Sequence, residues 1–146
     1  MMKKIGLYLG CVASTEQYGY ELSIREVMPE LGIELVDLDN ISCCGAPIRS
    51  INLLMQMYMS ARNIAICEER GLDMYAPCPQ CHLSLTETKN RLNSSKELRE
   101  KIVTKLKELE GLEYKGELKI YHTVDLLYDI VGIDKIKEKV KKHLKW

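Results

Sequence analysis

Five of the six cysteines are spaced like the ligands of a single site. One stands alone near the N-terminus, two are adjacent and precede a glycine, and two form a C-P-Q-C pair. Cysteine thiolates are the usual protein ligands of iron–sulfur clusters, and a C-x₂-C pair often supplies two of them. The pattern predicts one iron–sulfur cluster with five cysteine ligands: Cys11, Cys43, Cys44, Cys78 and Cys81.

Two other sites can be built from the same residue types. The C-x₂-C pair suits structural zinc, but adjacent Cys43-Cys44 and a fifth cysteine differ from the paired spacing that zinc sites use. C-P-Q-C at a helix start also resembles a redox dithiol, which leaves the other three cysteines without a role. The sixth cysteine, Cys67, lies in a segment rich in Met and Ile, so we expect it to be a buried core thiol.

Length and charge narrow the class of protein. The chain of 146 residues is long enough for one domain, predicted to span residues 1–146. Its 21 basic and 21 acidic residues cancel, so it lacks the basic excess of a nucleic-acid-binding protein. Its apolar runs are too short for a membrane span or a signal peptide. We therefore expect a cytoplasmic protein, in which six cysteines indicate metal binding or catalysis rather than disulfides.

Hydrophobic periodicity predicts strands alternating with helices. The predicted strands are 4–9, 33–38, 73–76 and 118–121. The predicted helices are 20–31, 50–70 with Ser50 as N-cap, 81–92, 96–109, 123–131 with Thr123 as cap, and 134–143. This order is typical of an α/β fold, here a single domain with a mainly parallel sheet of about four strands flanked by helices.

The predicted elements explain how distant cysteines could meet. Cys11 follows the first strand, Cys43 and Cys44 follow the second, and Cys78 and Cys81 follow the third. Ligands of open parallel sheets bind at the carboxyl ends of the strands. All five cysteines are therefore expected at one edge of the sheet. We also expect Gly45 to let the backbone pass close to a cluster without a side chain in the way.

The motifs are recognisable as a set. Gly10-Cys11, Cys43-Cys44-Gly45 and Cys78-Pro79-Gln80-Cys81 together resemble the cysteine-rich CCG domain. Over a wider stretch, the layout is similar to the N-terminal half of the B-subunit of the CoB–CoM heterodisulfide reductase of methanogens. That B-subunit has two CCG motifs, whereas this chain has one.

The resemblance implies a function and a set of partners. The five cysteines would bind a non-cubane [4Fe-4S] cluster, and the chain would take part in reductive cleavage of the CoM-S-S-CoB disulfide. Implied partners are the ferredoxin-like C-subunit, the flavin-containing A-subunit, and a second CCG-containing chain or copy. CCG domains also occur in other oxidoreductases, so an electron-transfer or accessory role there remains an alternative, as does a structural zinc module.

Two histidines are candidate catalytic residues. His82 follows Cys81 directly and could donate a proton to a leaving thiolate, because histidine titrates near neutral pH. His122 follows the fourth predicted strand at the same sheet edge as the cysteines. Arg49 and Arg62 could pair with an anionic substrate, although a structural ion pair is the commoner role of such arginines.

Overall fold

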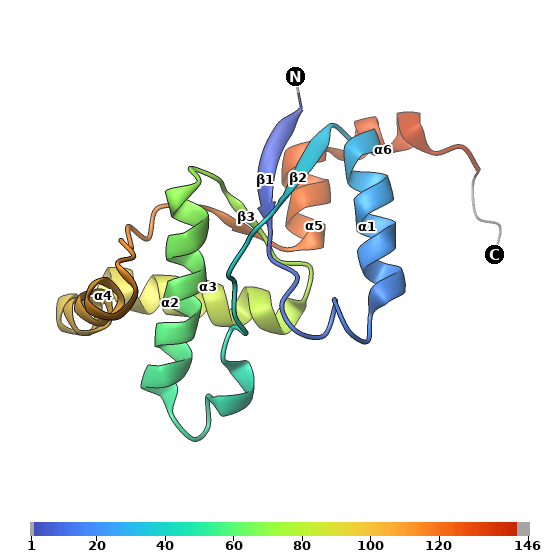
Figure 1. The fold of residues 1–146 in the computed structure, drawn as a ribbon. Coiled ribbons are helices and arrows are strands. Elements are labelled where there is room, and N and C mark those ends of the chain that lie inside the picture. Colours follow the sequence, from blue (N-terminus) through green and yellow to red (C-terminus); the bar gives the residue numbers. More distant parts are fainter. Residues whose placement is uncertain (1, 143–146) are drawn as a thin grey trace.

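A sheet of four parallel strands forms the centre of the computed structural model, which describes residues 2–142 (Figure 1). The strands, in the spatial order β2-β1-β3-β4, are β1 (Lys3–Leu7), β2 (Ile33–Asp37), β3 (Met74–Tyr75) and β4 (Ile120–Tyr121). In the register, Leu7 lies opposite both Asp37 and Tyr75, and Tyr75 lies opposite Tyr121. The four carboxyl ends are therefore level, and the residues that follow them meet at one edge.

Helices cover both faces of the sheet (Figure 1). The first face carries α1 (Tyr18–Glu30), α5 (Thr123–Asp125), the π-helix η2 (Leu126–Val131) and α6 (Ile133–Lys139). The second face carries α2 (Leu53–Glu69), α3 (Pro79–Ser94) and α4 (Lys96–Glu110). This arrangement confirms the predicted α/β class with a parallel four-stranded sheet.

The alternation of side chains along β1 builds a core on each side. Ile5 and Leu7 are buried against the α1 side, together with Ile24 and Met28 of that helix. Gly6 faces α2 instead, and a Cβ there would lie 2.9 Å from Cys67 Sγ. The glycine thus lets α2 approach the sheet closely.

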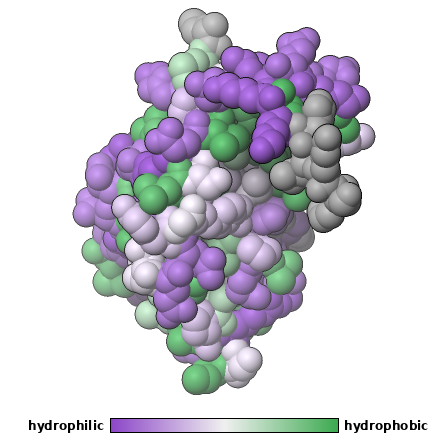
Figure 2. Space-filling model, turned by 90° about the vertical axis from the view of Figure 1, so that its right-hand side faces the viewer, coloured by the Kyte–Doolittle hydropathy of each residue, from purple (hydrophilic) through white to green (hydrophobic). Residues whose placement is uncertain are grey.

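On the outer surface of the α1 side, polar residues lie between the apolar ones. Figure 2 shows this side with hydrophobic residues in separate patches among hydrophilic ones. Leu22 and Val27 of α1 are among the exposed apolar residues. Within the part of the chain that the structure describes, no helix combines the length and apolar character needed to cross a membrane.

Two helix boundaries in the middle of the chain differ from the prediction. Helix α2 begins at Leu53 rather than residue 50, because Ala46–Ile48 forms a 3₁₀ turn (η1) and Asn52 caps the helix by accepting the Met55 N–H at 3.0 Å. Helix α3 continues through the predicted break at 93–94. Ser95 then caps α4 by accepting the Leu98 N–H.

The C-terminal helices also depart from the prediction. His122, not Thr123, occupies the cap position of α5, and its N–H donates to Asp125 Oδ2 at 3.0 Å. Thr123 Oγ1 bonds the hydroxyls of Tyr20 at 2.6 Å and Tyr75 at 2.9 Å instead. The predicted helix 123–131 becomes one α-helical turn followed by η2. The predicted helix 134–143 ends at Lys139, and position 143 lies outside the described residues.

Candidate cysteine centre

Three loops bring the five cysteines to the carboxyl edge of the sheet. Cys11, Cys43, Cys44 and Cys78 lie in the loops that follow their strands, whereas Cys81 lies in the first turn of α3. The segments after β1 and β3 flank the point where the strand order reverses. Three thiols are at least partly accessible and two are buried: Cys11 is exposed, Cys43 and Cys78 are half-buried, and Cys44 and Cys81 are buried. A site built this way can be reached from solvent through one side while its other side is held in the core.

The five thiols form a connected series. Cys11 interacts with Cys43, which neighbours Cys44. Cys44 in turn contacts Cys81, and Cys81 contacts Cys78. Among residues 2–142, no three Cys, His, Asp or Glu side chains converge on one point where a single metal ion would sit. The interactions thus run from Cys11 through Cys43, Cys44 and Cys81 to Cys78.

Contact between the two buried thiols, Cys44 and Cys81, shifts their pKa values in opposite directions. Hydrogen bonding from Cys81 lowers the pKa of Cys44 to about 6, although burial acts in the opposite direction. The same contact, followed by burial, raises the pKa of Cys81. The contact therefore favours a thiolate at Cys44 and a proton on Cys81, and the thiolate is the form in which a cysteine binds metals.

Two features of the surroundings fit an anionic sulfur-rich group. A Cβ added to Gly10, whose φ is +69°, would lie 2.8 Å from Cys81 Sγ, so the loop after β1 passes directly over this thiol. The buried hydroxyl of Ser84 on α3 lies beside Cys44, and hydrogen bonding from this hydroxyl helps to lower the pKa of the thiol. A hydroxyl donor that faces a thiolate is what such a group would need.

Tyr8 is a buried residue of the centre that the sequence did not single out. Its side chain is fully buried, and its hydroxyl donates to the Ser42 carbonyl at 2.7 Å. Burial raises the pKa of Tyr8, and the nearby thiols, with Cys44 and Cys81 foremost, raise it further. Tyr8 therefore stays a neutral hydroxyl that joins the first loop of the centre to the second.

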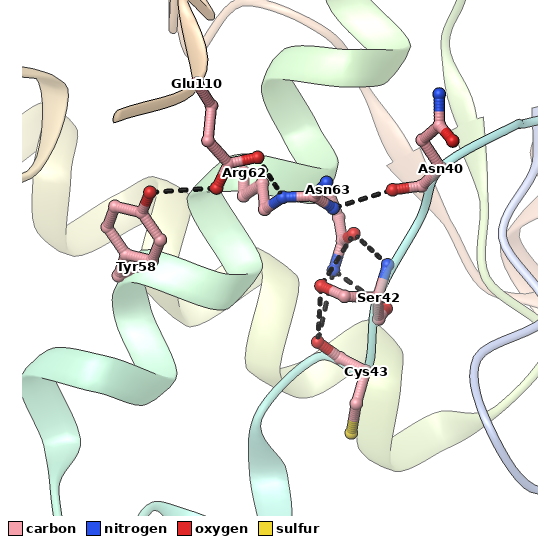
Figure 3. Close-up of polar contacts among 7 residues, drawn as sticks. All are labelled: Asn40, Ser42, Cys43, Tyr58, Arg62, Asn63 and Glu110. Carbon is pink, nitrogen blue, oxygen red and sulfur yellow. Dashed lines mark hydrogen bonds and ion pairs between the residues drawn. The ribbon is translucent and has the colours of Figure 1, made fainter. Parts of the chain in front are cut away.

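Asn63 of α2 holds the backbone that precedes the CCG motif (Figure 3). Its Oδ1 accepts the Ser42 N–H at 2.8 Å. Its Nδ2 donates to the carbonyls of Ser42 at 3.1 Å and Cys43 at 3.2 Å. Since Asn63 is fully buried, these bonds satisfy backbone groups that water cannot reach.

Ser60 and Gln56 hold the next carbonyl. Ser60 Oγ donates to the Cys44 carbonyl at 2.7 Å, and Gln56 Nε2 donates to Ser60 Oγ at 3.0 Å. Gly45 then packs on α2, where an added Cβ would lie 2.9 Å from Gln56 Cα. The missing side chain of Gly45 thus makes room for the helix backbone, and the close approach of the Gly45 backbone to a cluster stays a prediction. Gly10 is the glycine that passes over a thiol.

Both arginines of the region form ion pairs. Arg62 donates to the Asn40 carbonyl at 2.7 Å and pairs with Glu110, which also accepts from Tyr58 (Figure 3). Arg49 pairs with Glu87 at 2.5 Å. These contacts agree with the structural role considered for the arginines rather than with a free anion-binding role.

The two candidate histidines lie next to each other. The ring centroids of His82 and His122 are 5.8 Å apart. His82 Nε2 lies 3.6 Å from Asp125 Oδ2, the same oxygen that accepts the His122 N–H. The structure thus brings one residue of α3 and one that follows β4 into a His–His–Asp group.

Sequence reasoning missed the residues that support the centre rather than those that form it. Gln56, Ser60 and Asn63 are spaced by four and three positions, which places them on one helix face. This polar stripe in a helix otherwise rich in Met, Ala and Ile was the available signal. Nothing in the local sequence marked Tyr8 or Ser84, since their roles depend on contacts between distant segments.

Comparison with known proteins places the chain in a family. Residues 5–86 match the CCG family, described as a cysteine-rich domain. The chain is 37% identical over 142 residues to a heterodisulfide reductase B-subunit-like protein of Archaeoglobus profundus, covering 96% of this chain and 47% of that protein. It is 31% identical to the B-subunit of the ferredoxin/F(420)H(2)-dependent CoB-CoM heterodisulfide reductase of Methanosarcina acetivorans, covering 93% and 46%.

Two further proteins are similar over most of the chain. The 8-methylmenaquinol:fumarate reductase membrane anchor subunit of Wolinella succinogenes is 30% identical, with coverage of 99% of this chain and 49% of that one. A crystal structure of a hypothetical protein from Helicobacter pylori shares the fold, with a TM-score of 0.73 at 19% identity over 82% of this chain and 24% of that chain. The chain thus spans about half the length of the curated relatives it matches. The cysteine pattern, the fold that gathers it and the matched residues show that this chain belongs to the cysteine-rich CCG domain family.

Proposed function

We propose that Cys11, Cys43, Cys44, Cys78 and Cys81 bind a non-cubane [4Fe-4S] cluster. The observation that carries the proposal is the connected series of five thiols at the carboxyl edge of the sheet. Ligands of a cluster are distributed over several irons, whereas zinc ligands must surround one ion. Five thiolates therefore fit a cluster better than a structural zinc ion, which takes four ligands.

The chain would then act as the iron–sulfur redox subunit, or half-subunit, of a heterodisulfide reductase-like complex. The names of two relatives support this role, since both are heterodisulfide reductase B-type proteins. The substrate would be the CoM-S-S-CoB disulfide. The implied partners are the ferredoxin-like C-subunit, the flavin-containing A-subunit, and a second CCG-containing chain or copy, all in the cytoplasm.

The reaction needs electrons and protons at the same edge of the sheet. Cleavage of a disulfide consumes two electrons and two protons and yields two thiols. The bound cluster supplies electron transfer and Lewis acidity. His82 and His122 would hold the protons that the leaving thiolates take up, and Asp125 would orient His82 through its carboxylate.

The accessible side of the centre has room for a small molecule. A cavity of about 300 Å³ lies beside Cys78 and is bounded by Val12, Tyr20 and Pro77. Its volume is at the lower end of small-molecule sites. Largely apolar walls next to an accessible thiol suit the aliphatic part of a small disulfide.

A second candidate is the same cluster in a different oxidoreductase. The similarity to the 8-methylmenaquinol:fumarate reductase subunit favours this alternative, in which the chain binds a cluster and transfers electrons without cleaving a disulfide. Turnover of CoM-S-S-CoB by the assembled complex, compared with turnover of fumarate, would distinguish the two roles.

The cluster itself is tested by anaerobic purification of the full chain. We expect a brown protein with iron and acid-labile sulfide, and a changed spectrum when any of the five cysteines is replaced by serine. Cys67→Ser is the matched control, because Cys67 is buried away from these five thiols, and it should keep the wild-type spectrum. A colourless protein with stoichiometric zinc would contradict the proposal, and an unchanged spectrum in Cys44→Ser would reduce the site to four ligands.

A further inference from the structure

The peptide that joins Cys44 to Gly45 is bonded at both ends. Its carbonyl accepts from Ser60 Oγ at 2.7 Å and from Gln56 Nε2 at 3.4 Å. Its N–H points the other way and donates to Cys43 Sγ at 3.4 Å. All peptide bonds of the described chain are trans, so the N–H and carbonyl of this unit are antiparallel. A donor on the carbonyl side therefore fixes the direction of the N–H on the sulfur side.

The donors form a chain that is itself buried. Gln56 Nε2 also lies 3.3 Å from Thr88 Oγ1 and 3.0 Å from Ser60 Oγ, so α2 and α3 hold the amide from two sides. Gln56, Ser60 and Thr88 are all at most 3% exposed. Hydrogen bonds in such a chain polarise one another more strongly inside a protein than in water. The carbonyl of Cys44 thus carries more negative charge, and the N–H of Gly45 more positive charge, than a free peptide would.

We propose that Ser60, supported by Gln56, is a positioning residue that polarises the Cys44–Gly45 peptide toward the Cys43 sulfur and so raises the reduction potential of the bound cluster. Hydrogen bonds to ligand sulfurs favour the more negative, reduced state of a cluster. This inference deepens the proposed function and rests on it. It assigns a redox role to side chains of α2 that bond the backbone of the CCG loop.

The test is a redox titration of the reconstituted full chain. We expect Ser60→Ala to shift the cluster potential to more negative values. Gln56→Met keeps the side-chain length but loses the amide, so it should shift the potential in the same direction by less. Ile64→Val is the control, because Ile64 is fully buried on the same helix and makes no polar contact with the loop. It should lower stability without moving the potential.

A second readout needs no cluster. In cluster-free protein, hydrogen exchange of the Gly45 amide should become roughly tenfold faster in Ser60→Ala and stay unchanged in Ile64→Val. Equal potentials in wild type and both polar variants, with unchanged Gly45 exchange, would overturn the inference and leave the proposed function intact. If Ser60→Ala loses the cluster, the cluster potential of Gln56→Met is the test: a more negative value than wild type supports the inference, and an equal value contradicts it. A wild-type chain that takes up neither iron nor sulfide would instead overturn the proposed function.

Discussion

The six cysteines differ in what surrounds each thiol. Five face one another at the sheet edge, while Cys67 lies in the core beside β1 and the carbonyl of Leu72, which is 3.4 Å from its sulfur. Burial raises the pKa of Cys67 to about 12, and the neighbouring charges of Glu68 and Asp73 add to the effect. The expected core role of Cys67 is confirmed, and its chemistry is opposite to that of Cys44, whose pKa is lowered.

The raised pKa of Cys67 predicts a loss of stability in alkali. Between pH 9 and 12 the unfolded chain releases the Cys67 proton while the folded chain keeps it, so folding stability falls as pH rises. The contribution of this group is at most about 1.4 kcal/mol per pH unit. Denaturant unfolding of wild type and Cys67→Ser at pH 8 and pH 10 should show a smaller decline in the variant, which keeps a donor to the Leu72 carbonyl. An equal decline in both proteins would contradict the assignment.

Helix α2 is the element that shapes the CCG loop. One of its faces supplies the polar side chains that bind the loop backbone, and its own backbone receives Gly45. Gly45 has a φ of +83°, so this position needs glycine for two reasons: the left-handed conformation and the lack of space for a Cβ. The second reason is the one that couples the loop to the helix.

Replacing Gly45 and Gly71 by alanine, one at a time, distinguishes the cost of the left-handed conformation from the cost of the missing space. Gly71→Ala places a Cβ in open space at φ +65°, so it should cost about 1 kcal/mol of stability from backbone strain alone. Gly45→Ala adds a contact of 2.9 Å with the backbone of Gln56 and should cost about 2–4 kcal/mol. Chemical denaturation of both variants measures the difference. Equal losses would show that α2 tolerates a side chain at position 45.

At the scale of the whole molecule, a buried carboxylate connects α2 to the last strand. Glu68 accepts four backbone N–H groups from the segment before β4. The bonds come from Lys115 at 2.8 Å, Gly116 at 3.1 Å, Glu117 at 2.7 Å and Leu118 at 3.2 Å. Because β4 leads directly to His122, this contact fixes the side of the edge that carries the histidine pair.

Glu68→Gln should therefore destabilise the fold although it is nearly isosteric. The amide nitrogen that replaces one oxygen cannot accept the two N–H groups that point at it, which should cost about 3 kcal/mol. Glu69→Gln is the matched control, since Glu69 is exposed on the same helix and should change stability by less than about 0.5 kcal/mol. Thermal and denaturant unfolding would measure both, and similar values for the two variants would contradict the role of Glu68.

Local pattern and spacing determined much of this protein. Apolar runs predicted the four strands, glycines predicted the ends of α1, α2 and η2, and the strand order placed all five cysteines at one edge. Boundaries failed where two caps competed, as at Ser50 and Asn52, because both residue types can cap a helix and only the 3₁₀ turn before Asn52 decided between them. Helix 134–143 was overextended, because its periodicity did not show that Val140 adopts an extended conformation.

Tertiary structure decided how the centre is held. The ligand cysteines could be predicted from residue type and spacing, since few functions other than metal or cluster binding need adjacent thiols and a C-x₂-C pair. Their support comes from ordinary residues, such as Asn63, Ser60, Tyr8 and Ser84, whose roles exist only once distant backbone groups are buried against them. Gly45 shows the division most clearly. From the sequence, a glycine at this position predicted a close approach of the backbone to another group. Only the tertiary structure identified that group as the backbone of α2.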